Sequence, residues 1–242
     1  MIGHVTRSPD KGALPYVPTL SKEHVEQVRR WHKRAYAEGR AEGRGEQSFY
    51  YLGTEIVVPP DVMPVTPMSH LLGEAVLAEV KTGERVLDMG TGSGVNAILA
   101  ATKGARALAV DINPHALGAA GANAERNGVA DLVEVKYSEV FSKVEGTFDL
   151  VVFDPPFMWF RPRDLLEAAM TDEGHGALRA FFGGVRSHLA PSGRVLIFFG
   201  TSGDLGYLQR LVDSSGFVSE VIAQDELTRD GWRVQYFTFR LT

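Results

Sequence analysis

The sequence predicts an α/β fold in which seven strands form a mostly parallel sheet, with an antiparallel last strand and helices on both faces. Two observations predict it. From residue 69 onward, short apolar runs that suit buried strands alternate with amphipathic stretches that suit helices. The chain then closes with two β-rich runs joined by the turn residues 228–231, which indicates an antiparallel edge. Its 242 residues are enough for one sizeable core.

The N-terminal region precedes this alternation. Residues 1–20 carry three prolines and predict an irregular arm. Ser21 suits the N-cap of a helix whose apolar residues recur at helical spacing. The stretch SFYYLGTEIVV, residues 48–58, predicts two short strands that turn near Gly53.

The remaining elements follow in order, and the chain divides into three expected regions. These regions are an arm and helix (1–47), a β-hairpin and linker (48–68), and an α/β domain (69–242). Within the domain, Pro114 suits the first turn of a helix. The predicted elements are helix 70–80, strand 85–90, helix 94–104, strand 105–112, helix 114–128, strands 132–138 and 148–154, a helix at about 177–189, strand 194–200, a helix near 204–215 and the hairpin 217–241.

Composition limits the class of protein. The net charge is −5, from 25 basic and 30 acidic residues, so the chain lacks the basic surplus of a protein that wraps nucleic acid. A local basic run, RRWHKR at residues 29–34, suits either phosphate contact or a solvated helix face. Cysteine is absent, which excludes disulfides, cysteine zinc sites and thiolate catalysis. The N-terminus has no apolar signal-peptide core and no apolar run of about 18 residues exists, so we expect a cytoplasmic protein without a membrane partner.

The first motif with chemical meaning is VLDMGTGSGVN, residues 86–96. Gly90, Gly92 and Gly94 permit a sharp turn from strand to helix and a close backbone approach to a ligand. Asp88 stands two residues before the first glycine, where its charge would repel a pyrophosphate, and the GxGxG spacing differs from the GxGxxG of nicotinamide enzymes. We therefore predict a loop for a cationic ligand with an amino-acid head, in preference to a plain glycine-rich turn or a dehydrogenase site.

Two further acids follow predicted strands. Asp111 ends the second strand of the domain, where a carboxylate accepts hydrogen bonds from ribose hydroxyls in nucleotide-binding folds. The alternative is an acid that caps the next helix. Glu139 follows the third strand and suits an adenine amino group, and its alternative is a solvated loop acid.

The stretch VVFDPPFMWF, residues 151–160, places an acid and two prolines at the end of a buried strand. Asp154, the Pro155 carbonyl and the Phe157 ring together suit a planar NH2 group, whose two hydrogens need two acceptors. Such acceptors localise the nitrogen lone pair, and the carboxylate stabilises the positive charge that develops on the nitrogen. The alternative is a proline-rich strand exit with buried aromatic rings.

These motifs, LDMGTGSG, AVDINP, YSEVF and FDLVVFDPPF in this order, resemble those of class I S-adenosylmethionine-dependent methyltransferases, which have a Rossmann-like fold. The DPPF signature resembles that of the branch that methylates nitrogen, and residues 48–242 are similar to the release-factor glutamine and small-domain methyltransferase group. The resemblance implies S-adenosylmethionine as cofactor. It implies cofactor contacts by Asp88, Gly90, Thr91, Gly92, Gly94, Asp111, Ile112 and Glu139, and acceptor contacts by Asp154, Pro155, Pro156 and Phe157.

Departures from that group leave the acceptor open. The release-factor enzymes carry Asn at the position of Asp154 and Tyr at that of Phe157, and the DPP form is commoner among adenine-amino methylases of nucleic acid. The segment PVTPMSH, residues 64–70, lacks the acids of the corresponding family segment. The region before residue 48 is also short for a helical substrate domain.

The connection at residues 158–176 is long for a compact domain and leaves the strand that ends at the DPPF motif. Trp159 and Phe160 are candidates for a wall of the acceptor pocket, and Arg161 or Arg163 for contact with an anionic acceptor. The alternative is a disordered surface loop with solvated arginines.

From these motifs we predict methyl transfer from S-adenosylmethionine to a planar amide or amino nitrogen, with no metal. A protein side chain or a small molecule is the first choice of acceptor. The alternatives are an exocyclic base amine of RNA or DNA, and a non-catalytic module that binds the cofactor.

Overall fold

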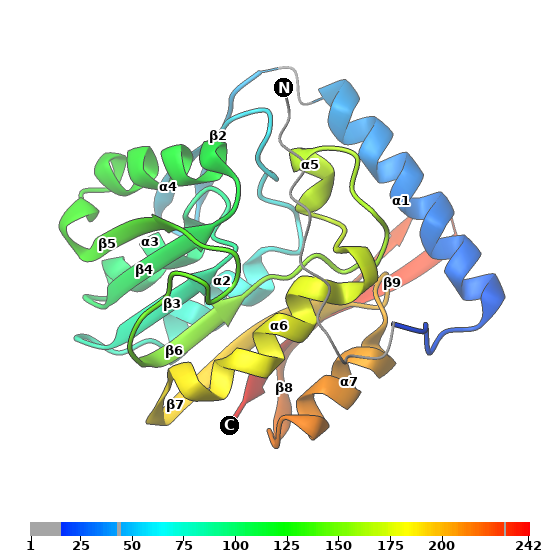
Figure 1. The fold of residues 1–242 in the computed structure, drawn as a ribbon. Coiled ribbons are helices and arrows are strands. Elements are labelled where there is room, and N and C mark those ends of the chain that lie inside the picture. The colour runs from blue at the N-terminus through cyan, green and yellow to red at the C-terminus, as the bar shows by residue number, and fades with distance from the viewer. Residues whose placement is uncertain (1–15, 43–44, 230) are drawn as a thin grey trace.

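The computed structural model describes residues 16–42, 45–229 and 231–242, and Figure 1 shows its ribbon. No helix formed by these residues is long and apolar enough to cross a membrane. The strands are β1 (Gln47–Tyr51), β2 (Thr54–Val58), β3 (Arg85–Met89), β4 (Arg106–Asp111), β5 (Val133–Tyr137), β6 (Phe148–Phe153), β7 (Leu189–Gly200), β8 (Ser219–Arg229) and β9 (Trp232–Leu241). The helices are α1 (Lys22–Glu42), α2 (His70–Glu79), α3 (Val95–Thr102), α4 (Pro114–Arg126), α5 (Leu165–Ala168), α6 (Gly176–Gly184) and α7 (Leu205–Ser214), with 3-10 turns η1 (Ala130–Leu132), η2 (Glu173–His175) and η3 (Val185–His188).

Seven strands form one sheet in the order β5-β4-β3-β6-β7-β9-β8. β3 pairs in parallel with β4 and β6, whereas β9 is antiparallel to β7 and β8, which confirms the predicted fold class. After β3 the chain adds β4 and β5 on one side of β3 within the sheet, and it then crosses over to add β6 on the other side of β3. Ligands of open α/β sheets bind at the carboxyl edge of such a switch point.

The two faces of the sheet carry separate apolar clusters, because neighbouring residues of a strand point to opposite faces. In β6, Val152 packs in the cluster that contains α2, α3 and α4, whereas Val151 and Phe153 pack in the cluster with α6 and α7. In β3, Val86 belongs to the first cluster, so Asp88, two residues later, points to the same side of the sheet.

The predicted hairpin is present as a separate two-stranded sheet, β1 with β2. Its turn residues Leu52 and Gly53 both have positive φ, 46° and 86°, as a two-residue type I′ turn requires. The side chain of Asn123 in α4 is fully buried; its oxygen accepts from Val57 N at 2.9 Å and its nitrogen donates to Val57 O at 2.8 Å. The hairpin is thereby tied to the helical face of the domain.

Helix α1 packs on the segment at residues 158–176, and in Figure 1 it runs beside α5. A third apolar cluster joins Val28 of α1 to Met158 and Trp159. The disordered-loop alternative for this segment is wrong, because the segment contains α5, η2 and a bridge between Met158 and Thr171. Residues 1–15 of the predicted irregular arm lie outside the described residues.

The boundaries of α6 and β7 differ from those predicted. The helix ends at Gly184, before η3, and the strand begins at Leu189 where residue 194 was expected. The early part of β7 pairs irregularly, since Phe148 faces Leu189 and the register then shifts. Gly193 fits there because a Cβ at this position would lie 2.7 Å from the Phe148 carbonyl oxygen. A proline and a glycine within a strand obscure the strand pattern in the sequence.

Candidate active site

The glycine loop between β3 and α3 takes a conformation that glycine alone adopts easily. Gly90, Gly92 and Gly94 have φ of 69°, 55° and 87°. A Cβ on Gly94 would lie 2.9 Å from the Cα of Ala120, so α3 and α4 can approach only with glycine here. At Gly90 and Gly92 a Cβ would meet no neighbour closer than 3.9 Å, so the backbone is open on that side.

Asp88 is almost fully buried, with 1% of its surface exposed. Its Oδ2 accepts from Thr91 Oγ1 at 2.6 Å and from Ala97 N at 3.1 Å, so the acid holds both ends of the glycine loop. Burial raises the pKa of Asp88 to about 6; the two hydrogen bonds oppose the shift and the charge of Asp111 adds to it.

Asp111 supports the same loop from β4. Its Oδ2 accepts from Gly92 N at 3.0 Å, and its Oδ1 accepts from Asn113 N at 2.9 Å. Burial raises the pKa of Asp111, against the effect of these bonds. Each carboxylate oxygen has further acceptor capacity. The next residue, Ile112, is 42% exposed, which is unusual for isoleucine at the end of a sheet strand.

Glu139 stands in a turn that is tied to Asp111. Ser138 N donates to the Asp111 carbonyl at 3.1 Å, and Ser138 Oγ donates to Val140 O at 2.6 Å. Glu139 N donates to Ser142 Oγ at 3.0 Å, and the Glu139 side chain is partly exposed. The turn therefore brings Glu139 to the side of Asp111 at the carboxyl edge of the sheet.

Asp154 directly follows β6, and its side chain is exposed. Protein on its other sides nevertheless desolvates the carboxylate, and the charge of Asp88 adds repulsion, so the pKa of Asp154 rises to about 7. Exposure and desolvation are compatible for a carboxylate that meets water on one side only. A carboxylate with this pKa can take up a proton near neutral pH.

Asp88 thus lies close enough to Asp111 and to Asp154 for charge repulsion within each of these two pairs. Asp111 raises the pKa of Asp88, and Asp88 raises that of Asp154, in addition to the dominant effect of burial. Carboxylates with mutual repulsion are stabilised by a cation placed among them. The site therefore suits a positively charged ligand and opposes a pyrophosphate.

The residues after Asp154 leave the strand under aromatic cover. Pro155 is buried, and Phe157 is partly exposed. The Phe157 ring centroid lies 4.9 Å from that of Phe199 and 5.6 Å from that of Phe198, both on β7. These contacts fix the Phe157 ring beside the end of the sheet.

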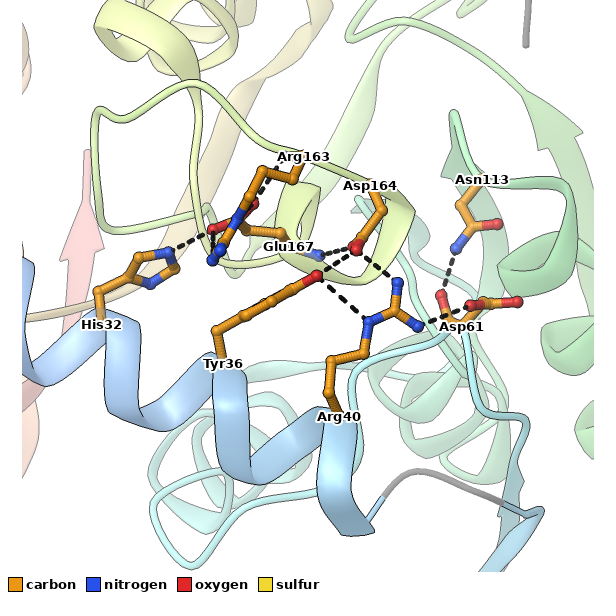
Figure 2. A network of polar contacts seen from close by, with 8 residues as sticks. All are labelled: His32, Tyr36, Arg40, Asp61, Asn113, Arg163, Asp164 and Glu167. Carbon is orange, nitrogen blue, oxygen red and sulfur yellow. Dashed lines mark hydrogen bonds and ion pairs between the residues drawn. The ribbon is translucent and has the colours of Figure 1, made fainter. Parts of the chain in front are cut away.

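A polar network that the sequence analysis did not identify joins α1 to α5, as Figure 2 shows. Its centre is Glu167, which is 3% exposed and accepts from His32 Nε2 at 2.8 Å and from Arg163 Nε and Nη2 at 2.8 and 2.7 Å. Burial alone would raise the pKa of Glu167, but the hydrogen bonds from Arg163 and His32 outweigh it and lower the pKa to about 2. Asp164 accepts from Tyr36 Oη, from Arg40 Nη2 and from Glu167 N at 2.9 Å.

This network changes the interpretation of the aromatic and basic residues. The Arg163 guanidinium is bound to Glu167 and lies 3.9 Å from the Tyr36 ring centroid, so Arg163 is neither simply solvated nor available to an anionic acceptor without losing these contacts. Trp159 is 8% exposed and packs on Tyr16, at 5.6 Å between ring centroids. The interpretation of residues 29–34 as a solvated helix face is wrong for His32, because this side chain is buried.

Two sequence signals for the network existed. Asp164 and Glu167 form a D-x-x-E pattern, which is typical of a helix N-terminus. His32, Tyr36 and Arg40 recur every four residues, so they share one face of α1. Neither signal indicates a partner, because the contacts span 124 to 135 residues of sequence.

Comparison with known proteins agrees with this geometry. Residues 65–226 match the family described as methyltransferase small domain. The release factor glutamine methyltransferase of Agrobacterium fabrum is 31% identical over 231 residues, which cover 85% of this chain and 78% of that protein. The ribosomal protein L11 methyltransferase of Thermus thermophilus is 39% identical over 129 residues, 53% of this chain and 43% of that protein.

The fold is also that of solved methyltransferases. The crystal structure of ribosomal protein L11 methylase from Lactobacillus delbrueckii subsp. bulgaricus superposes with a TM-score of 0.55 at 21% identity, over 75% of this chain and 82% of that one. The sequence resemblance to the small-domain and release-factor group is confirmed by the family match and by the curated relatives. The chain therefore belongs to the methyltransferase small domain family and is an S-adenosylmethionine-dependent methyltransferase.

Proposed function

We propose that this chain methylates a planar amide or amino nitrogen of a protein side chain or a small molecule. The observation that carries the proposal is Asp154. It is a carboxylate with a pKa of about 7, it stands at the switch point of the sheet, and Pro155, Pro156 and Phe157 follow it. The release factor glutamine methyltransferase of Agrobacterium fabrum supports an amide acceptor, since its name specifies glutamine.

The residues at the carboxyl edge fit S-adenosylmethionine, which supplies a methyl group on a positively charged sulfur when it is bound. The mutually repelling acids suit that sulfonium and the ammonium of the methionine part. Asp88, Thr91 and the three glycines of the loop would hold the methionine part. Asp111 would accept from the ribose hydroxyls, and Ile112 and Glu139 would flank the adenine.

The way in which the site would activate the methyl-accepting nitrogen follows from two hydrogen-bond acceptors placed at that nitrogen. The Asp154 carboxylate and the Pro155 carbonyl would accept the two N–H groups, and Phe157 would stack on the acceptor plane, so the nitrogen lone pair points at the methyl carbon. Transfer of the methyl group would break its bond to sulfur and leave the sulfur neutral, and the positive charge would pass to the nitrogen, where Asp154 would stabilise it. Asp154 would then take up the proton that the nitrogen releases, which its raised pKa permits.

A second candidate acceptor is an exocyclic amine of an RNA or DNA base. The specific observation in its favour is an acid at position 154, since the DPP form resembles that of adenine-amino methylases. Against it stand the net charge of −5 and relatives whose names specify protein acceptors.

One experiment separates the candidates. The protein is incubated with S-adenosylmethionine that carries a tritiated methyl group and with fractionated bacterial extract, and separate samples of the product are treated with protease, ribonuclease or deoxyribonuclease, or are dialysed. We expect the tritium label either in material that protease digests, which indicates a protein acceptor, or in material that passes the dialysis membrane, which indicates a small molecule. Label that only ribonuclease or deoxyribonuclease releases would make the base amine the acceptor, and no label in any fraction would contradict both candidates.

A further inference from the structure

Three residues of α1 form a stripe that faces α5, and we call His32, Tyr36 and Arg40 the α1 stripe (Figure 2). His32 is buried and contacts Glu167, while Tyr36 and Arg40 both donate to Asp164. Because residues four apart share a helix face, one rigid helix fixes all three positions relative to one another.

A continuous chain of hydrogen bonds leads from this stripe to the DPPF motif. His32 Nε2 lies 2.8 Å from the Glu167 carboxylate, and the Glu167 backbone carbonyl accepts from Met170 N at 2.9 Å. The Met170 carbonyl in turn accepts from Met158 N at 3.2 Å. Met158 directly follows Phe157, so the residue after the motif is tied to α1.

The other end of the stripe reaches the cofactor side of the sheet. Arg40 Nη1 lies 3.9 Å from Asp61 Oδ1, and the Asp61 carbonyl accepts from Asn113 Nδ2 at 2.8 Å. Asn113 N donates to Asp111, the acid proposed for the ribose. In Figure 2 these residues extend from α1 to Asn113, but the Arg40–Asp61 pair is long and both of its side chains are 44% exposed, so this end of the stripe holds the cofactor side only weakly.

The chemistry of the network favours a positioning role over a purely stabilising one. Glu167 is a buried carboxylate whose arginine partner is 55% exposed, so desolvation of the acid and solvent screening of Arg163 offset much of the attraction, and the pair is a weak means of holding a fold together. Bonds from α1 to the two carboxylates, from His32 to Glu167 and from Tyr36 and Arg40 to Asp164, do, however, fix direction and register. The third apolar cluster, of Val28, Met158 and Trp159, already supplies apolar packing between the same elements.

We propose that the α1 stripe is a positioning element of the acceptor site: through Glu167 and Asp164 it holds residues 158–170, and thereby keeps Asp154 to Phe157 in the geometry that receives the acceptor nitrogen. The inference rests on the proposed function of Asp154 to Phe157. It assigns a role in acceptor use, and none in cofactor binding, to a helix that lies outside the matched family region of residues 65–226.

The test uses the full chain with Glu167→Gln and Asp164→Asn, which keep size and remove charge. Glu173→Gln is the matched control, since Glu173 is exposed in the same segment. Tyr36→Phe is a milder variant that removes the hydroxyl bound to Asp164 and keeps the ring under Arg163. Folding is checked by urea unfolding, S-adenosylhomocysteine binding by calorimetry, methyl transfer with tritiated S-adenosylmethionine into a titrated, undialysed bacterial extract, and opening of the segment by hydrogen exchange of the Met158 amide.

We expect Glu167→Gln and Asp164→Asn to bind S-adenosylhomocysteine as the wild type does, while the rate at subsaturating extract falls about 10- to 100-fold, the usual effect of a misplaced reacting group. In both variants the backbone amide of Met158, which donates to the Met170 carbonyl, should exchange its hydrogen with solvent faster than in the wild type. Glu173→Gln should match the wild type in every measurement, and Tyr36→Phe should lower the rate and speed the exchange, as Glu167→Gln does, with binding unchanged.

An unchanged rate in folded Glu167→Gln overturns the proposal, as does an unchanged rate in Tyr36→Phe if Glu167→Gln does not fold. An equal loss of S-adenosylhomocysteine affinity and of rate also overturns it, because the network would then support the fold in general. A wild type that binds S-adenosylhomocysteine but transfers no label contradicts the proposed function instead, and the two failures are therefore distinguishable.

Discussion

Replacing Asp88 by Asn should stabilise the ligand-free protein at neutral pH and abolish its use of the cofactor. Asp88 is buried, and burial raises its pKa from an ordinary value of 3.8 to about 6. The folded state therefore binds a proton more tightly than the unfolded state does. Between these two pKa values the free energy of unfolding falls as the pH rises, because the buried acid must ionise without a partner cation.

The size of this effect follows from the shift. A difference of about 2 pKa units corresponds to about 3 kcal/mol when the acid is fully ionised in both states. At pH 4.5 about 1 kcal/mol of that cost is already present, since an unfolded aspartate is largely ionised there. The advantage of Asp88→Asn over the wild type should thus grow by about 2 kcal/mol between pH 4.5 and pH 7.5. Any cost of the amide itself is independent of pH and cancels in this comparison.

Urea unfolding of both proteins across that pH range measures the difference. Asp131→Asn, on the exposed surface of η1, is the matched control and should stay within about 0.5 kcal/mol of the wild type throughout. In a second measurement, S-adenosylhomocysteine should raise the unfolding temperature of the wild type and leave that of Asp88→Asn unchanged. A stability difference that does not vary with pH would refute the argument that Asp88 is held ionised at a cost for the sake of a cation.

Three further outcomes are expected. Asp154→Asn should lower kcat about 10- to 1000-fold without a change in S-adenosylhomocysteine affinity, because it keeps the shape and removes the charge that faces the developing cation; single-turnover label transfer measures this, and near-normal kcat in folded Asp154→Ala contradicts it. Asp111→Ala should weaken S-adenosylhomocysteine binding about 10- to 100-fold through the loss of a charged acceptor, and unchanged affinity in calorimetry means that the ribose assignment is wrong. Random duplex DNA should not bind at physiological salt, given the net charge of −5, and a tight, salt-dependent gel shift would favour the base amine.

Those parts of the fold that depend on local pattern could be predicted from the sequence. The alternation of apolar strands and amphipathic helices indicated the parallel sheet, and the turn at Gly53 indicated the hairpin. Gly94 could be singled out because a left-handed φ and close contact with Ala120 both require glycine, which leaves a visible spacing in the sequence. Asp88 was identifiable because an acid is rare near the end of a buried strand, and the structure shows that it also holds the glycine loop through Thr91 and Ala97.

The rest depended on contacts between distant segments, which local pattern does not encode. Glu167 looks like an ordinary helix acid, and only the fold brings His32 to it across 135 residues. Arg163 looks like a solvated arginine until the Tyr36 ring and Glu167 are placed beside it. The start of β7 was missed because Gly193 weakens the strand pattern at the point where the pairing with Phe148 is irregular.

The packing of α1 has a consequence for the order in which the chain folds. Tyr16 donates to Asp204, 188 residues later, and the Trp31 ring lies 5.9 Å from that of Trp232. At a translation rate of about 5 to 20 residues per second, about 10 to 40 s separate the synthesis of Trp31 from that of Trp232. Most of the stability of a helix in a protein comes from the packing of its apolar face, and the part of the α1 face that contacts Trp232 remains uncovered during this interval. Helix α1 thus completes its docking only after most of the sheet has been synthesised, so nascent chains that stall before residue 232 expose an apolar surface to chaperones and to one another.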